Sequence, residues 1–184
     1  MKTRITINDG SINAPEPSKL QKRWLEPYFS TASTTNQAPA AAGTVYLNLF
    51  EVPFDVTVDA INIVNGDSVA GNVIVGVYGP IPTEETPLDA VVAVESASTA
   101  LSGVNGPQTI SLTPTVLRTG RYYLASEYSD TTTRYFRNGN QIQVTGWSFT
   151  YARGGGYGAL TNPCPAPTES GSAIPSSTRV RIQN

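Results

Sequence analysis

From Thr44 onward, hydrophobic and polar residues alternate with a period of two, and this alternation constrains the fold more than any other feature of the sequence. Successive side chains of a β-strand point to opposite faces of the sheet, so this period predicts strands. Turn signals such as Asn65-Gly66 and Thr119-Gly120 separate the alternating runs. The pattern predicts an all-β protein, an antiparallel β-sandwich or jelly roll of about eight or nine strands.

The composition agrees with short strands joined by tight turns. Charged residues make up only 14% of the 184-residue chain, and Gly (16) and Pro (14) are abundant. Gly and Pro disfavour long helices, and no helical pattern alternates with the strands, so a parallel α/β fold is not expected. The length fits one domain with an appendage.

One irregularity interrupts the alternation in the second predicted strand. Val56 and Val58 share a face, and the next apolar residues on that strand are Ile61 and Ile63. The step from Val58 to Ile61 is odd, whereas residues on one face of a strand are separated by even steps. An inserted residue restores the register, so the sequence predicts a β-bulge near Asp59–Ala60.

Residues 1–43 differ from the rest, and we expect them to form an extended N-terminal arm on a domain of residues 44–184. Residues 30–43 are small, polar and uncharged, and such a segment buries too little apolar surface to offset its ordering entropy alone. A short helix at Ser18–Leu25 is one option within the arm, and a disordered tail is the alternative for the whole of it. Four bulky residues favour an arm that orders on a partner subunit: Trp24, Leu25, Tyr28 and Phe29.

Charge is segregated along the chain. No Lys or Arg lies between Glu26 and Leu117, whereas seven arginines follow from Arg118 onward. One interpretation is that the strands interleave in the fold and the charges neutralise each other locally. The other is that opposite poles of neighbouring copies meet, since complementary potentials fix register and partner choice.

The residues needed for common catalytic and metal chemistry are scarce. Histidine is absent, which removes the commonest general base and metal ligand, and the single cysteine, Cys164, has no CxxC partner. We therefore predict no enzyme activity, no cofactor and no metal. The alternatives are a carboxylate pair at Glu84-Glu85 for glycoside hydrolysis and a calcium site among Asp55, Asp59 and Asp67.

Tyrosines are abundant in the second half of the chain, and strand alternation places Tyr122 and Tyr123 on opposite faces. At least one of the two is therefore expected to face away from the core. Core and interface packing is the first interpretation of these aromatic residues, and a platform for a host glycan is the second. The candidate interface or glycan contacts are Tyr123, Tyr128, Tyr151, Tyr157 and Arg153.

Three stretches of the sequence resemble a module of tailed-bacteriophage virion proteins. They are LFEVPFDVTVDAINIV (49–64), GNVIVGVYG (71–79) and LTPTVLRTGRYYLASEYSDTTTRYF (112–136). The module has a "VP, apolar, aspartate, apolar" strand, a "GIY"-like strand and a late "PG-x-YYLA" strand, which appears here as Thr119–Ala125. The resemblance covers residues 44–136 and implies a β-sandwich virion component with no catalytic residues.

From these observations we expect a bacteriophage structural protein, made in the host cytoplasm and located in the virion. A capsid decoration (cement) protein that docks through its N-terminal arm is the first interpretation. A tail, baseplate or tail-fibre subunit and a host-glycan-binding module are the alternatives. Other virion proteins, such as a major capsid or tail protein, are the expected partners, together with copies of the chain itself in a homo-oligomer, for which we expect a trimer. The net charge of −2 and the lack of a long apolar stretch argue against binding to nucleic acid or to a membrane.

Overall fold

The computed structural model describes residues 23–25, 35–81, 87–137, 148–152, 156–167, 169–170 and 179–183. All regular structure in these ranges is β-strand, and no helix occurs in them. The strands are β1 (Arg23–Leu25), β2 (Thr35–Gln37), β3 (Thr44–Val52), β4 (Val56–Val64), β5 (Asn72–Ile81), β6 (Val92–Glu95), β7 (Thr99–Ala100), β8 (Pro107–Leu117), β9 (Gly120–Tyr128), β10 (Tyr135–Arg137), β11 (Ser148–Ala152), β12 (Glu169–Ser170) and β13 (Arg179–Gln183).

The predicted all-β class is confirmed. Eight of the thirteen strands have four or more residues, and the other five have two or three. These five are too short for alternation to reveal them, which is why the sequence predicts fewer strands. The helix considered at Ser18–Leu25 is wrong at its C-terminal end, because Arg23–Leu25 forms strand β1; the rest of that range lies outside the described residues.

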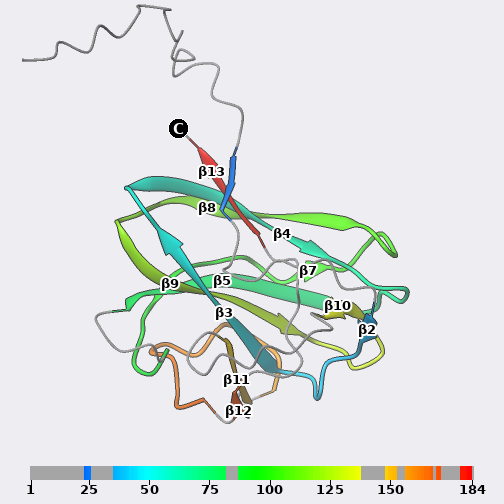
Figure 1. The fold of residues 1–184 in the computed structure, drawn as a ribbon. Coiled ribbons are helices and arrows are strands. Elements are labelled where there is room, and N and C mark those ends of the chain that lie inside the picture. Colours follow the sequence, from blue (N-terminus) through cyan, green and yellow to red (C-terminus); the bar gives the residue numbers. More distant parts are fainter. Residues whose placement is uncertain are drawn as a thin grey trace, which may run out of the picture.

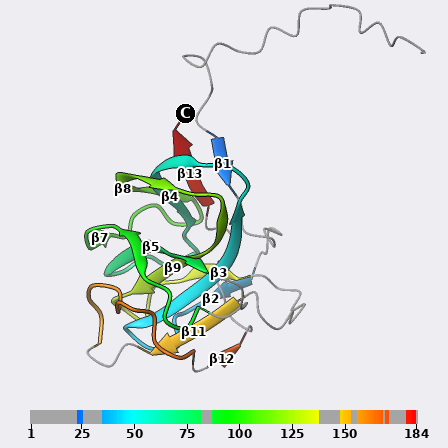
Figure 2. The same ribbon diagram turned by 90° about the vertical axis from the view of Figure 1, so that its left-hand side faces the viewer.

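Two antiparallel sheets face each other as the layers of a sandwich (Figures 1 and 2). The smaller sheet has four strands in the order β1-β13-β4-β8. The larger sheet has seven strands, with the order β12-β11-β3-β9-β5-β6 and β7 paired to β5. A separate two-stranded pair, β10-β2, lies at one end. The sandwich prediction is therefore confirmed, whereas the jelly-roll alternative stays a prediction.

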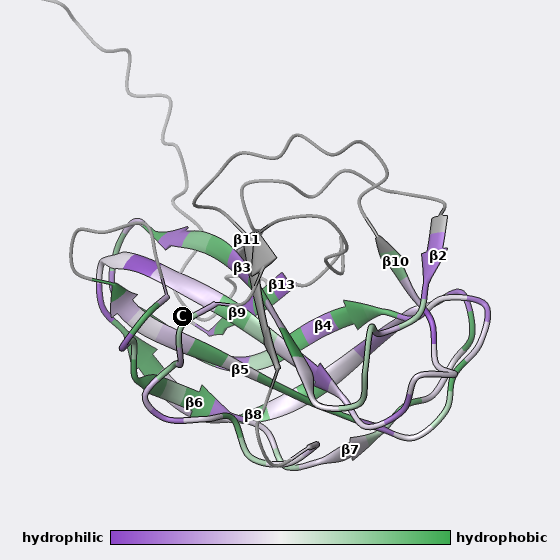
Figure 3. Cartoon of the chain, turned by 90° about the horizontal axis from the view of Figure 1, so that it is seen from below, coloured by the Kyte–Doolittle hydropathy of each residue, from purple (hydrophilic) through white to green (hydrophobic). Residues whose placement is uncertain are grey.

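The main hydrophobic core fills the space between the two sheets. Alternate residues of each long strand enter it, such as Phe50, Val75 and Leu124 from the larger sheet and Ile61 and Ile110 from the smaller one. The hydrophobic stretches, green in Figure 3, fall on strands such as β4, β5 and β6. At the end near β2 and β10, Tyr46, Tyr128 and Tyr135 pack ring against ring, with centroids 5.4 to 6.3 Å apart.

A second hydrophobic core covers the opposite face of the larger sheet. It contains the other set of alternating residues, including Leu47, Ile74 and Tyr123, and residues 156–164 close over it with Leu160 and Cys164. In Figure 1 this covering segment, in orange, lies on the side of the larger sheet away from β4 and β8. The larger sheet is thus buried on both faces.

The predicted bulge is present in β4. Val58 pairs with Ile182 and Ala60 pairs with Arg181, so Asp59 is the extra residue opposite two consecutive residues of β13. On the other side, Val58 pairs with Thr115 and Ala60 with Ser111. The bulge places Ile61 and Ile63 on the core face, as the sequence predicts.

The described parts of residues 1–43 do not extend away from the body, which corrects part of the expected arm. Strand β1 pairs with β13, and β2 pairs with β10. Gly43 adopts a φ of 78°, and a Cβ there would lie 2.7 Å from the backbone of Gly156, so this stretch packs tightly against the segment that covers the second core. The backbone N–H of Ala40 also donates to the hydroxyl of Tyr46 at 2.9 Å. The boundary at residue 43 stays a prediction, because most of residues 1–34 lie outside the described residues, but residues 35–43 lie against the body.

Candidate docking edge and face

The N-terminal segment meets the body at the edge of the smaller sheet. Strand β1 pairs antiparallel with β13 over three residues: Arg23 opposite Ile182, Trp24 opposite Arg181 and Leu25 opposite Val180. Ile182 and Val180 are buried, and Trp24 is half-buried. Two of the four predicted anchors, Trp24 and Leu25, therefore lie on the strand that pairs with β13. The other two, Tyr28 and Phe29, lie outside the described residues.

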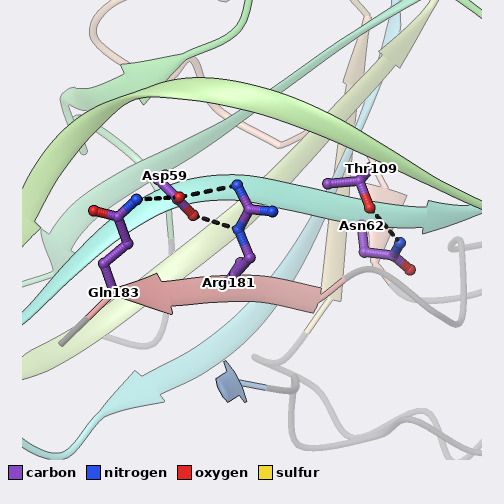
Figure 4. A network of polar contacts seen from close by, with 5 residues as sticks. All are labelled: Asp59, Asn62, Thr109, Arg181 and Gln183. Carbon is purple, nitrogen blue, oxygen red and sulfur yellow. Dashed lines mark hydrogen bonds and ion pairs between the residues drawn. The ribbon is translucent and has the colours of Figure 1, made fainter. Parts of the chain in front are cut away.

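An ion pair on the outer face of the smaller sheet, next to this edge, holds β13 against β4. Arg181 donates through Nε and Nη2 to the two carboxylate oxygens of Asp59, at 2.5 and 2.9 Å, and Gln183 donates to Asp59 from the same strand (Figure 4). Asp59 is buried because it lies at the bulge, under these two side chains. A bidentate guanidinium–carboxylate pair has a fixed geometry, so it holds the β13 side chains at this site in register with β4.

Polar side chains continue across the same face. The Asn62 side-chain amide donates to the Thr109 hydroxyl at 3.2 Å, linking β4 to β8 (Figure 4). Trp24, Arg181, Ala60 and Ser111 are successive register partners across the four strands, so they lie in one row. Within the described residues, this face carries the Asp59–Arg181–Gln183 network and the Asn62–Thr109 hydrogen bond, with Trp24 at its β1 end.

The opposite edge of the smaller sheet, strand β8, is protected against strand addition. Three residues, Leu112, Thr113 and Pro114, lie opposite the single residue Asp59, which makes β8 irregular at its middle. Proline lacks a backbone donor, and bulges and prolines on edge strands oppose pairing with another chain. Docking by strand addition is therefore better suited to the β13 edge than to β8.

Two further arginines of the described residues, Arg118 and Arg134, also pair with acids of the same chain. Arg118 contacts Asp55 at 2.5 Å, and Asp55 also accepts from the backbone N–H of Thr119 at 2.9 Å. The hydrogen bond from Arg118 lowers the pKa of Asp55 below its usual value. Arg134 lies 3.7 Å from Asp67. These pairs join early-chain acids to late-chain arginines, so local neutralisation within the fold is the interpretation that the described contacts support.

Two of the predicted glycan or interface contacts are wrong, because Tyr123 and Tyr128 are buried, with 0% and 1% of their surface exposed. Tyr122 and Tyr123 do lie on opposite faces of β9, but each face has its own core. Burial also raises the pKa of Tyr128. The prediction assumed one solvent-facing side for the larger sheet, and the segment that covers it removes that side.

The other predicted contacts are only partly described. Tyr157 is half-buried, and its hydroxyl lies 2.8 Å from that of Ser98. The side chain of Tyr151 and the whole of Arg153 lie outside the described residues. The structure therefore brings none of the predicted tyrosines together on an exposed surface within its described part.

Two carboxylates and a cysteine secure the segment over the second core. Glu127 accepts from the backbone N–H of Gly158 at 3.3 Å, and Glu95 accepts from that of Leu160 at 2.8 Å. Cys164 is buried, and burial raises the pKa of its thiol to about 12. A protonated, inaccessible thiol is a poor nucleophile and metal ligand, so Cys164 acts as a packing residue.

The described residues give no support to the two chemical alternatives, the carboxylate pair for glycoside hydrolysis and the calcium site. Glu84 and Glu85 lie outside the described residues. Asp55, Asp59 and Asp67 each face a different arginine, and no group of three metal-binding side chains occurs in the described ranges. No helix there is long and apolar enough to cross a membrane.

The Asp59–Arg181–Gln183 network is part of the candidate docking face, and the sequence analysis did not predict that these three residues contact one another. The only signal for it was the odd step at Val58–Ile61, which predicts the bulge but not its partner. Asp59 and Arg181 are 122 residues apart in the chain, so no local pattern connects them. The sequence matches no known protein family and no curated protein.

Proposed function

We propose that this chain is a non-enzymatic structural subunit of a bacteriophage virion, and that it docks in the particle through its N-terminal segment at the edge of the smaller sheet. A capsid decoration protein is the form of the proposal that we favour. Its partners are then other virion proteins and further copies of the chain.

The observation that carries the proposal is the pairing of β1 with β13. Three residues from the N-terminal segment add to a sheet edge, with Trp24 beside Arg181. Strand addition is a common way for extended segments to join proteins, because backbone hydrogen bonds give affinity and side chains give register. Here the pairing is made within one chain, and the same pairing made to a neighbouring subunit would link the two subunits.

Two further features support the same proposal. The β-sandwich agrees with the fold implied by the resemblance of residues 44–136 to phage virion modules. The outer face of the smaller sheet carries the polar Asp59–Arg181–Gln183 network, a surface suited to contacts with neighbours, whereas both faces of the larger sheet are packed with hydrophobic residues. A glycan platform has less support, because Tyr123 and Tyr128 are buried.

Antibody labelling tests the location. An antibody raised against the purified chain is applied to virus particles from the source of the sequence, and the particles are imaged by electron microscopy. We expect label on the capsid surface. Label confined to the tail would support the tail or baseplate alternative, and particles without label would contradict a virion role.

A truncation tests the docking segment. Because residues 35–43 pack against the body, the truncation removes residues 1–25 and leaves β2 and Gly43 in place. We expect the truncated chain to fold, shown by an unchanged far-ultraviolet circular dichroism spectrum, and to be missing from particles. Incorporation equal to that of the full chain would contradict docking through this segment.

A further inference from the structure

The pairing of β1 with its own β13 is short compared with the rest of the fold. It covers three residue pairs, whereas β13 pairs with β4 over five and β3 pairs with β9 over eight. Short terminal strands open locally at little free-energy cost, well below that of global unfolding. The β13 edge therefore exchanges its strand more readily than any central strand does.

An empty β13 edge would be a favourable site for another strand. Its residues Val180 and Ile182 point into the core, and its outward residue Arg181 is fixed by Asp59. The backbone groups along such an edge form a template for pairing with another chain. The opposite edge, β8, is blocked at its middle by the irregularity around Pro114, so the smaller sheet offers one usable edge.

The chain between β1 and the body is long enough to reach a neighbour. Nine residues, 26–34, separate β1 from β2. Nine extended residues span about 30 Å, at about 3.3 to 3.6 Å per residue. That reach is of the order of the diameter of a domain of this size, so β1 can lie on its own body or on one beside it.

We propose that, in assembled copies of this chain, strand β1 of one copy occupies the β13 edge of a second copy in place of that copy's own β1. The proposal rests on the proposed function, since it names a second copy as the partner of the same edge. A second copy carries the same Arg23-Trp24-Leu25 sequence, so it fits the edge in the same register. Exchange of an identical element is a low-cost route to oligomers, because each contact broken in one copy is remade in its partner.

Disulfide trapping tests the exchange. Trp24→Cys and Arg181→Cys are placed on separate, differently tagged chains that are co-expressed, purified and oxidised. Directly opposed residues in antiparallel strands have Cα atoms about 4.5 to 5.5 Å apart, within the range that a disulfide bridges. Cys164 is buried and does not compete. We expect a disulfide between the two chains, in proportion to the oligomer measured by light scattering.

Two controls make the result decisive. The double variant W24C/R181C shows whether the edge still folds, because it forms a disulfide in either arrangement, and its failure to do so would overturn the pairing itself. Asn62→Cys and Thr109→Cys on separate chains provide the matched control, since β4 and β8 are neighbours within one body. These two chains should not cross-link to each other.

The unmodified chain provides an independent measurement. Isotope-labelled and unlabelled chains are unfolded, mixed and refolded, and isotope-filtered nuclear Overhauser spectra are recorded. Contacts between Trp24 of one chain and Arg181 of the other are expected. If W24C/R181C closes only within single chains and no cross-chain contact appears, the exchange is wrong, while antibody labelling of particles still decides the proposed function separately.

Discussion

The two sheets of this sandwich differ in how many of their faces are buried. The seven-stranded sheet has a hydrophobic core on each face, so both alternating sets of its residues are apolar, as in Leu47 and Leu124. The four-stranded sheet has a core on one face and the Asp59–Arg181–Gln183 network on the other. The comparison indicates that hydrophobic packing is concentrated on the larger sheet, and it is the smaller sheet that we propose as the surface and edge for partners.

The largest expected effect tests whether both faces of the larger sheet are truly core. Leu124→Ala and Leu47→Ala each remove a fully buried leucine, one from each core. Both should lower the free energy of unfolding by about 2–5 kcal/mol, measured by denaturant titration, because each leaves a cavity. Leu88→Ala, at a residue that is 48% exposed, is the matched control. A Leu47→Ala loss as small as that of the control would contradict a second core.

The next effect tests how tightly the cover over the second core is held. Cys164 has its thiol pKa raised to about 12 by burial, so folding favours the protonated thiol. At pH 8 we expect the native chain to react with a thiol reagent at least about 100-fold more slowly than the unfolded chain. Because the pKa of the Cys164 thiol is raised in the folded chain, the thiol's contribution to the free energy of unfolding is fully present below the pKa of the unfolded chain's thiol. That contribution is lost as the pH rises toward 12. Equal rates in native and unfolded chains would show that the cover opens freely.

A smaller effect tests the polar network of the four-stranded sheet. Asp59→Ala leaves Arg181, whose side chain is 20% exposed, without its carboxylate partner. We expect a loss of about 1–3 kcal/mol in the free energy of unfolding, because an uncompensated, partly buried charge remains. Asp67→Ala removes the half-exposed partner of Arg134 and should cost less than about 0.5 kcal/mol. Equal losses in the two variants would contradict a structural role for the bulge pair.

The smallest effect tests whether the outer side of the smaller sheet is open. Val116 lies on β8, opposite Thr57, and is 56% exposed. Val116→Thr should change the free energy of unfolding by about 0.5 kcal/mol or less, measured by thermal or denaturant unfolding. A loss greater than about 1 kcal/mol would indicate that this side is covered within the chain.

The same comparison explains what the sequence predicted and what it did not. Alternation predicted the long strands, and the odd step at Val58–Ile61 predicted the bulge, because both depend on neighbouring residues. The burial of Tyr123 depends on Leu160 and Cys164, which are distant in the chain. The Asp59–Arg181 pair likewise joins strands whose proximity arises only from the topology. Local periodicity specifies which residues share a face, but it does not specify what covers that face.

The sequence did not predict that residues 35–43 lie against the body, for a related reason. Residues 35–43 have little apolar surface, yet backbone pairing of β2 with β10 and the contact of Gly43 with Gly156 attach them to the body. Backbone hydrogen bonds do not depend on hydrophobic side chains, so composition alone understates the attachment of such a segment.

Amide hydrogen exchange measured residue by residue tests the central claim most directly, namely that a stable larger sheet carries a smaller sheet with an exchangeable edge strand. Hydrogen-bonded amides of β9 should exchange slowest, near the rate set by global unfolding, and those of β1 at least about 100-fold faster. Amides of β1 that exchange as slowly as those of β9 in a monomeric sample would contradict the account.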